Sequence, residues 1–276
     1  MSISSPSRLN PARPAPAPDK GVIGQTLWLL AIASMASSMS MRLADPMLPD
    51  LARSFGGKPT DMAGVATWFS VAYAGLILVQ GPLGDRLGKL NVITISTFVA
   101  ALASLACALA PTLGTLNALR FINGAACAGL IPLSLAWIGD NIGIDQRQQT
   151  LAGFAAASTG GLILGQMSGG IIADLIGWRY AFVAPALVYL IAGTALWRAR
   201  HRVPAPPPVD NGQSAIRQTL TNYRNLFNDR WARTVMILVG LEGAFYFGAI
   251  AFVPTFLHQS LGIALWQAGL NAMAPK

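Results

Sequence analysis

The stretch Gly81-Pro82-Leu83-Gly84-Asp85-Arg86-Leu87-Gly88-Lys89 lies between two apolar runs, and each run is long enough to cross a lipid bilayer. Three residues of the stretch are glycine and three are charged, unlike the runs on either side. Charged side chains are costly inside a bilayer, whereas glycine permits tight turns. The stretch is therefore predicted to be a tight, charged turn that joins two membrane spans.

The composition of the whole chain predicts a polytopic membrane protein. Of its 276 residues, 53% are hydrophobic and only 11% are charged, which is too apolar for an ordinary soluble domain. The net charge of +8 does not indicate a nucleic-acid partner, because the basic residues lie at the ends of apolar runs and form no continuous patch. Cys107 and Cys127 lie inside apolar runs, so neither a disulfide framework nor a metal site is predicted.

Apolar runs of roughly 18 to 25 residues predict seven membrane spans and the start of an eighth. The seven runs cover residues 22–48, 63–82, 91–110, 114–138, 149–173, 179–197 and 234–257. The first six form a predicted bundle over residues 22–197. Residues 258–276 are expected to hold an outer loop and a truncated eighth helix that begins near Leu265.

Two segments outside the spans have a distinct composition. Residues 1–21 are rich in Ser, Pro and Ala and lack the apolar core of a signal peptide, so a disordered tail is predicted. Residues 198–233 form a basic linker with a proline-rich spacer. Its later part repeats apolar residues at steps of three and four, which predicts an amphipathic helix on the membrane surface or a binding site for a partner helix. The repeated residues are Ile216, Leu220, Tyr223, Phe227 and Trp231.

The distribution of Lys and Arg predicts the orientation of the chain. If the amino-terminal tail is cytoplasmic, the cytoplasmic segments contain thirteen basic residues and the outer segments contain three. The positive-inside rule therefore places the amino terminus and residues 81–89 in the cytoplasm.

Residues 81–89 resemble the loop between the second and third helices of the major facilitator superfamily, whose pattern is Gly-x-x-x-Asp-Arg-x-Gly-Arg/Lys-Arg/Lys. The matching residues are Gly81, Asp85, Arg86, Gly88 and Lys89, and Leu90 departs from the last basic position. The resemblance implies that Asp85 meets the amino-terminal end of a helix in the carboxy-terminal half and latches one conformation. Arg86 and Lys89 would anchor the loop to the membrane surface. The alternative is a charged turn that only sets topology.

An internal repeat supports the same family. Residues 81–88 align with residues 170–177, which begin 89 residues later, and Gly84-Asp85 corresponds to Ala173-Asp174. Each copy follows the second span of a three-span group, so the two copies have opposite orientations. The predicted fold class is an all-α polytopic membrane protein, with a six-helix bundle of inverted three-plus-three repeats of the major facilitator type. A chance match in a glycine-rich chain is the alternative.

Two further stretches resemble patterns of this family. Arg120-Phe-Ile-Asn123-Gly124 resembles its fourth-helix Arg-x-x-Gln-Gly pattern. Residues 161–170 resemble the fifth-helix Gly-x-x-x-Gly-Pro-x-x-Gly-Gly pattern of antiporters, through Gly161, Gly165, Gly169 and Gly170, although Gln166 replaces the helix-bending proline. Small residues at intervals of four also predict close packing of a neighbouring helix, which in the family seals one side of the cavity; they are Gly153, Ala157, Gly161, Gly165 and Gly169.

Charged residues inside the first and fourth runs are candidates for proton coupling, because a charge near the bilayer centre costs about 2.5–3.5 kcal/mol. Arg42 and Asp45 lie three residues apart near the outer end of the first run, and Arg120 enters the fourth run at a similar depth. We hypothesise that Asp45 and Arg120 form a protonation-sensitive pair on the transport path. The alternative is a fixed structural pair of Asp45 with Arg42.

Glu242 is a second candidate for proton coupling. It lies in the seventh run with no basic residue within two helical turns. A buried, unpaired carboxyl can be neutral at one stage of a cycle and charged at another, as a proton carrier requires. The alternative is a carboxyl that only hydrogen-bonds to a neighbouring helix. Tyr246, four residues later, would lie on the same face and shape the cavity wall.

The resemblance implies a secondary transporter in the cell (inner) membrane, which exchanges a small organic compound for protons. The fifth-helix pattern favours export over import, and no motif of an enzyme or of a cofactor site occurs in the sequence. A non-transporting scaffold or receptor is the alternative from another class. Because complete members have two six-span halves, we expect this chain to need a missing carboxy-terminal half for activity.

Overall fold

The computed structural model describes residues 20–202, 221, 224–225 and 227–261, and the described part is helical without a strand. Residues 1–19 of the predicted tail lie outside the described residues, as do the predicted eighth helix and most of the predicted amphipathic helix; the tail prediction is wrong for residues 20 and 21, which are helical. The helices are α1 (Lys20–Arg42), η1 (Asp45–Met47), α2 (Leu48–Phe55), η2 (Pro59–Ala63), α3 (Gly64–Leu87), α4 (Lys89–Ala108), α5 (Leu113–Cys127), α6 (Leu130–Asn141), α7 (Ile144–Ile176), α8 (Trp178–Ala181), α9 (Val183–Ala199), η3 (Arg200–Arg202) and α11 (Arg230–Leu261).

Six helical stretches within the described residues are long and apolar enough to cross a membrane. Each overlaps one of the first six predicted runs, so the all-α polytopic fold class is confirmed. The stretches are Gly21–Phe55, Pro59–Leu87, Lys89–Ala108, Leu113–Asn141, Ile144–Ile176 and Trp178–Arg202. The predicted seventh run lies within α11, a single helix, and its role as a membrane span stays a prediction.

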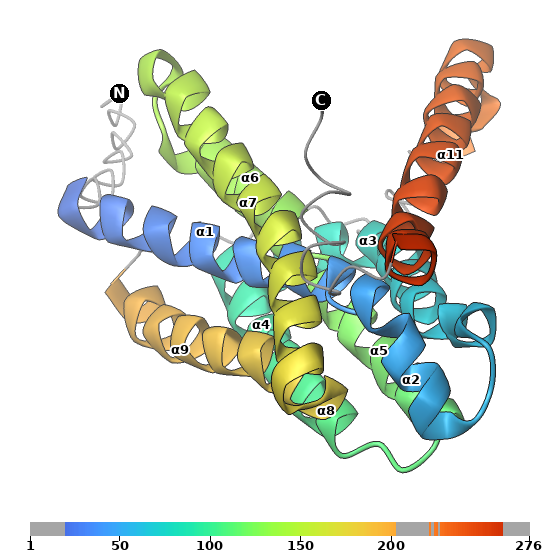
Figure 1. Ribbon diagram of the computed structural model, residues 1–276. Helices are drawn as coiled ribbons and strands as arrows, with labels where there is room; N and C mark the ends of the chain where they lie inside the picture. The colour runs from blue at the N-terminus through green and yellow to red at the C-terminus, as the bar shows by residue number, and fades with distance from the viewer. Residues whose placement is uncertain (1–19, 203–220, 222–223, 226, 262–276) are drawn as a thin grey trace, which may run out of the picture.

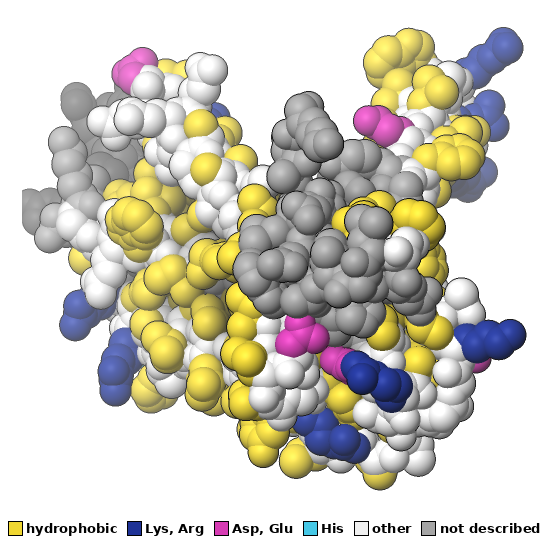
Figure 2. All heavy atoms as spheres, viewed as in Figure 1, with side chains coloured by type: hydrophobic (Ala, Val, Ile, Leu, Met, Phe, Trp, Pro, Cys, Tyr) yellow, Lys and Arg dark blue, Asp and Glu magenta, His cyan; other side chains and the backbone are white. Residues whose placement is uncertain are grey.

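Most of the helix pairs that pack together are far apart in the sequence. α1 packs against α7 and α9, α3 packs against α5, and α4 packs against α5 and α9 (Figure 1). Large hydrophobic side chains such as Leu102 and Ile191 remain exposed on the outside of the bundle, and Figure 2 shows hydrophobic side chains over much of the visible face. An apolar exterior of this kind suits contact with lipid chains.

The structure corrects the prediction of a turn over residues 81–89. α3 continues through Leu87 and α4 begins at Lys89, so only Gly88 separates the two helices. A helix satisfies its own backbone hydrogen bonds and tolerates charged side chains once it leaves the bilayer, which explains why the charged residues do not end α3. The helix ends at Gly88 because its φ of +86° and ψ of 129° suit glycine alone.

A similar glycine separates α7 from α8. Gly177 has φ +106° and ψ 151°, and it occupies the position that aligns with Gly88 in the internal repeat. Among the described residues, Gly56 is the other glycine with a positive φ. The shared backbone conformation at the two aligned positions supports the repeat, and the inverted three-plus-three arrangement stays a prediction.

Candidate functional site

An ion pair closes the end of the first span. Nη1 of Arg42, the last residue of α1, lies 3.0 Å from Oδ2 of Asp45, the first residue of η1. Both side chains are buried. Among the described residues, Arg42 is thus the ion-pair partner of Asp45, as the alternative interpretation expected, and no ion pair joins Asp45 to Arg120. The short connection from α1 to η1 favours this pairing because it keeps the two side chains close together.

Arg120 is completely buried in α5, where it connects three spans. Its Nε donates a hydrogen bond to the Val65 carbonyl of α3, and its Nη1 donates one to the Ser40 carbonyl of α1, both at 3.0 Å. The guanidinium also lies 4.3 Å from the centre of the Phe69 ring, within reach of a cation–π interaction. Nη2 has no hydrogen-bond partner in the described part of the chain. The positive charge is therefore stabilised by carbonyl oxygens and an aromatic face.

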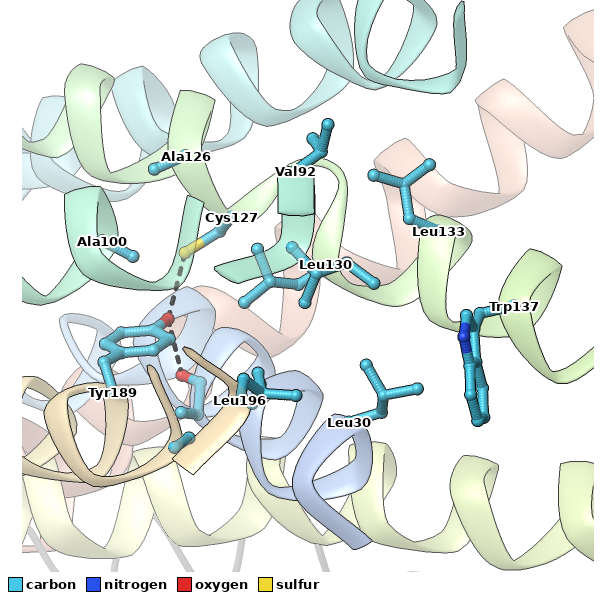
Figure 3. Packing of buried hydrophobic residues seen from close by; sticks show 14 of the residues in the cluster. Leu30, Val92, Ala100, Ala126, Cys127, Leu130, Leu133, Trp137, Tyr189 and Leu196 are labelled. Atoms are coloured by element: carbon cyan, nitrogen blue, oxygen red, sulfur yellow. Dashed lines mark hydrogen bonds between the residues drawn. The ribbon is translucent and has the colours of Figure 1, made fainter. Parts of the chain in front are cut away.

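A polar cluster that the sequence analysis missed lies deeper in the bundle. Tyr189 of α9 is fully buried; its hydroxyl donates a hydrogen bond to the Ala36 carbonyl at 2.9 Å and lies 3.1 Å from the Ser40 hydroxyl. It also lies 3.0 Å from Sγ of Cys127, as Figure 3 shows. Ser40 thus contacts both Tyr189 and, through its carbonyl, Arg120. The serines of the first apolar run were the available signal, because hydroxyl groups inside a span need partners.

Residues of the 81–89 segment contact the end of the fourth span. Lys89 Nζ lies 3.9 Å from an Asp85 carboxylate oxygen and also pairs with Asp140 at the end of α6. Gly84 lies so close to α6 that an added Cβ would be 2.5 Å from Leu133 Cδ2. The Asp85 side chain is 72% exposed, and Arg86 is also exposed, so both can contact groups outside the described residues.

Three glycines of α7 contact the backbone of α1. Cβ atoms added to Gly161, Gly165 and Gly169 would lie only 2.2–2.3 Å from carbonyl oxygens of α1 or the residue that follows it, namely those of Met35, Met39 and Leu43. The predicted extension of this close contact to Gly153 is wrong, because no neighbouring group among the described residues lies within 4 Å of its Cβ position. The two helices cross, as Figure 1 shows, so their backbones are in close contact over a limited length.

Gln166 lies within the same glycine-rich part of α7, next to Gly165. Its side chain is fully buried, as is Gly170, but neither atom of its amide has a hydrogen-bond partner within the described residues. A buried amide without partners is destabilising, by about 1–3 kcal/mol in protein mutational data. Replacement of the family's proline by glutamine therefore adds a polar group that this arrangement of helices does not satisfy.

The structure does not bury Glu242. The side chain lies on an exposed part of α11, whose main packing neighbour among the described elements is η1, the short helix that contains Asp45. The predicted burial of the Glu242 carboxyl is therefore wrong within the described part of the chain, because few of the described helices surround α11. The backbone of Tyr246 is helical, and its side chain lies outside the described part of the structure.

Replacing Gly88 by alanine is expected to destabilise the protein by about 1–3 kcal/mol, because an alanine at φ +86° is strained. Thermal unfolding in detergent micelles measures this loss. Gly81→Ala is the matched control, since Gly81 lies inside α3 and, in the described part of the chain, no neighbouring group is within 4 Å of its Cβ position. Equal unfolding temperatures for the two variants would contradict the assigned role of Gly88.

Comparison with known proteins places these features in a family. The family model of the Major Facilitator Superfamily matches residues 30–274. The chain is 31% identical over 146 residues to the puromycin resistance protein pur8 of Streptomyces alboniger, covering 52% of this chain and 29% of the relative. It is 32% identical over 172 residues to the probable multidrug resistance protein EmrY of Escherichia coli (strain K12), covering 61% of this chain and 33% of the relative.

A solved structure with a similar fold is that of a bacterial homologue of the human lysosomal transporter Spinster, in an inward-facing and unoccupied conformation. Its TM-score is 0.74 at 17% sequence identity, and the alignment covers 92% of this chain and 59% of that chain. The chain thus spans about a third of the length of the two curated relatives and more than half of the solved structure. The match to the family model over most of the sequence, together with the six membrane-capable helices, shows that the chain belongs to the Major Facilitator Superfamily.

Proposed function

We propose that this chain is part of a secondary active transporter that exports a small organic compound in exchange for protons, by alternating access. The names of two relatives, a puromycin resistance protein and a probable multidrug resistance protein, favour export over import. The observation that carries the proposal is the buried Arg42–Asp45 pair, which lies at the end of α1. We place the protein in the cell (inner) membrane with a cytoplasmic amino terminus.

Asp45 is the proposed proton carrier. Its carboxylate can pair with Arg42 only while it is ionised, so uptake of a proton removes the attraction that holds η1 to the end of α1. Arg120 acts as the fixed charge nearby, because its bonds to Val65 and Ser40 tie α5 to α3 and α1. Protonation of Asp45 would thus loosen one contact of the first span while Arg120 retains the others.

Glu242 and Tyr246 are proposed to supply a second part of the path. Exposure of Glu242 on α11 leaves its carboxyl accessible to groups that would approach from a carboxy-terminal half. Asp85 is proposed to contact a helix amino terminus of that half, where the helix dipole favours a negative charge. The relatives are longer than this chain, which supports the need for further spans.

Asp45→Asn is expected to abolish proton-driven accumulation of the transported compound. The amide cannot release a proton at physiological pH, so a proton gradient can no longer drive the cycle. The measurement uses this chain assembled with its carboxy-terminal half. It records accumulation of puromycin in proteoliposomes with an acidic lumen, with downhill exchange recorded in parallel. Exchange without a gradient should persist at a reduced rate.

The matched control for this measurement is Asp50→Asn. Asp50 lies on the following helix, α2, and pairs with the exposed Arg53, so its replacement should leave accumulation unchanged. Full gradient-driven accumulation by the Asp45→Asn variant would exclude Asp45 as the proton carrier. Absence of puromycin binding and flux in every variant and in the unmutated protein, each assembled with the carboxy-terminal half, would instead favour a scaffold or receptor.

A further inference from the structure

The fourth span is broken in its middle. α5 ends at Cys127 and α6 begins at Leu130. Pro132 explains the break, because proline has no backbone N–H and its ring displaces the carbonyl group four residues earlier, that of Ala128. The regular bonds on the two sides of the break are Ala128 N–H to the Gly124 carbonyl at 3.1 Å and Leu133 N–H to the Gly129 carbonyl at 3.0 Å.

Gln80 of α3 occupies the break. Its side chain is buried, and its Nε2 donates a 2.7 Å hydrogen bond to the carbonyl of Ala125, one turn before Gly129. Gly129 leaves room for this amide, because a Cβ at that position would lie only 1.7 Å from Gln80 Oε1. The glutamine amide therefore fills the space beside the break and replaces a hydrogen bond within the helix.

Serine hydroxyls of α1 contact the break from another side. The Ser37 hydroxyl lies 3.4 Å from the Cys127 carbonyl, and the Ser34 hydroxyl lies 3.4 Å from that of Leu130. Compared with these longer contacts, the Gln80 bond is short. Among the side chains that contact the break, Gln80 thus makes the shortest hydrogen bond to a helix other than its own.

The angle of this break determines where two charged residues lie. Arg120 is on α5, with its bonds to α1 and α3, whereas Asp140 is on α6 and pairs with Lys89 at the start of α4. We propose that Gln80 is a positioning residue that holds the fourth span at its Pro132 bend and so fixes Arg120 relative to Asp140. The role of Gln80 during transport rests on the proposed function. Its role in holding the bend does not.

The bend is tested by the distance between spin labels at Ala118 and Leu135, two exposed positions on α5 and α6. The labels are attached to the full chain in lipid nanodiscs, with Cys107 and Cys127 replaced by alanine. Gln80→Leu should shift and broaden the distance distribution, because leucine cannot donate to the Ala125 carbonyl. Gln166→Leu is the matched control: it removes another buried amide, which makes no hydrogen bond within the described residues, and should leave the distance unchanged. An unchanged distance in Gln80→Leu would overturn the proposal.

A size exchange tests the same contact by stability. Gly129→Ala alone should lower the unfolding temperature, because the new methyl group meets the Gln80 amide. Combining it with Gln80→Ala should recover most of that loss, since the amide is then absent. If Gly129→Ala lowered the unfolding temperature equally with Gln80 present and with Gln80 replaced by alanine, the placement of Gln80 in the break would be contradicted.

Flux measurements separate the inference from the proposed function. In the puromycin assay, Gln80→Leu should lower maximal flux with little change in the half-saturating concentration, because Gln80 acts on the movement of helices. An unchanged maximal flux would contradict its positioning role in transport. Absence of flux in the unmutated chain would count against the proposed function alone, because the label distance reports the bend without transport.

Discussion

Gly161→Ala is expected to destabilise the bundle strongly, whereas Gly160→Ala, one residue earlier on the same helix, is expected to leave it intact or slightly more stable. The new methyl carbon at position 161 would lie 2.3 Å from the Met35 carbonyl oxygen and 3.0 Å from the Met35 carbonyl carbon. A carbon and an oxygen in favourable contact are about 3.3–3.6 Å apart, so α1 and α7 must move apart. Backbone atoms cannot rotate away as a long side chain can.

The expected size of this effect follows from two opposing terms. Alanine is favoured over glycine inside a helix by about 1 kcal/mol, which benefits both variants equally. Overpacking typically costs about 1–3 kcal/mol, and here separation of the helices would also loosen the contacts at Gly165 and Gly169. Gly161→Ala should therefore lower the unfolding temperature by several degrees. Gly160→Ala should not, because the described structure has no neighbouring group within 4 Å of the Gly160 Cβ position.

Thermal unfolding in detergent, followed by the recovery of monodisperse protein on size-exclusion chromatography, measures both variants side by side. The pair controls for expression, helix propensity and position along the span. If both variants unfold at the temperature of the unmutated chain, α1 and α7 are not in backbone contact at Met35 and Gly161, and the crossing of the two helices would have to be reassigned.

Arg120→Met is expected to abolish transport while retaining the fold. Methionine is unbranched and apolar, and it removes the cost of burying a charge, which offsets the loss of the hydrogen bonds made by Arg120. The variant loses both hydrogen bonds that connect α5 to Val65 and Ser40, and it loses the positive charge beside the polar end of the first span. The expected result is an unfolding temperature close to that of the unmutated chain, with no gradient-driven flux of puromycin.

Arg120→Lys provides a second, more conservative variant. A lysine keeps the charge, but its ammonium lacks the planar fork with which Arg120 reaches two carbonyls at 3.0 Å, so transport should also be severely reduced. Arg179→Met is the control. Like Arg120, Arg179 donates a hydrogen bond to a backbone carbonyl, that of Ala110, and lies over an aromatic ring, that of Trp178. Unlike Arg120, it is exposed. Normal flux in Arg120→Met would exclude a role for this charge in transport.

The number and place of the first six spans could be predicted because the signal is local. Each run must be apolar over its own length to cross a bilayer, whatever its neighbours are. The alignment of Gly88 with Gly177 also came from local pattern, and the structure adds that both residues have a positive φ. The extent of α3 could not be predicted equally well, since charged residues are compatible with either a turn or a helix outside the bilayer.

The fourth span shows where local reasoning was incomplete. The sequence analysis predicted one run over residues 114–138 without a bend at Pro132. Proline in a membrane helix also does not identify the side chain that occupies the bend. That residue is Gln80, which lies 45 positions from its hydrogen-bond partner Ala125. The same limit applies to Tyr189, whose contacts with Ala36 and Ser40 join residues of the first and sixth spans.

The sequence by itself determined the class of protein, the positions of its first six spans and the family motifs, because these depend on hydropathy along a single segment and on residue identity. The tertiary structure decided that Asp45 pairs with Arg42, that Arg120 is held by carbonyl oxygens, and that Gly161 requires glycine while Gly153 does not. The physical reason is that a side chain's partner in a membrane bundle depends on which helices cross and at what depth. Periodicity within one helix specifies a face, but only the packed neighbour determines what that face contacts.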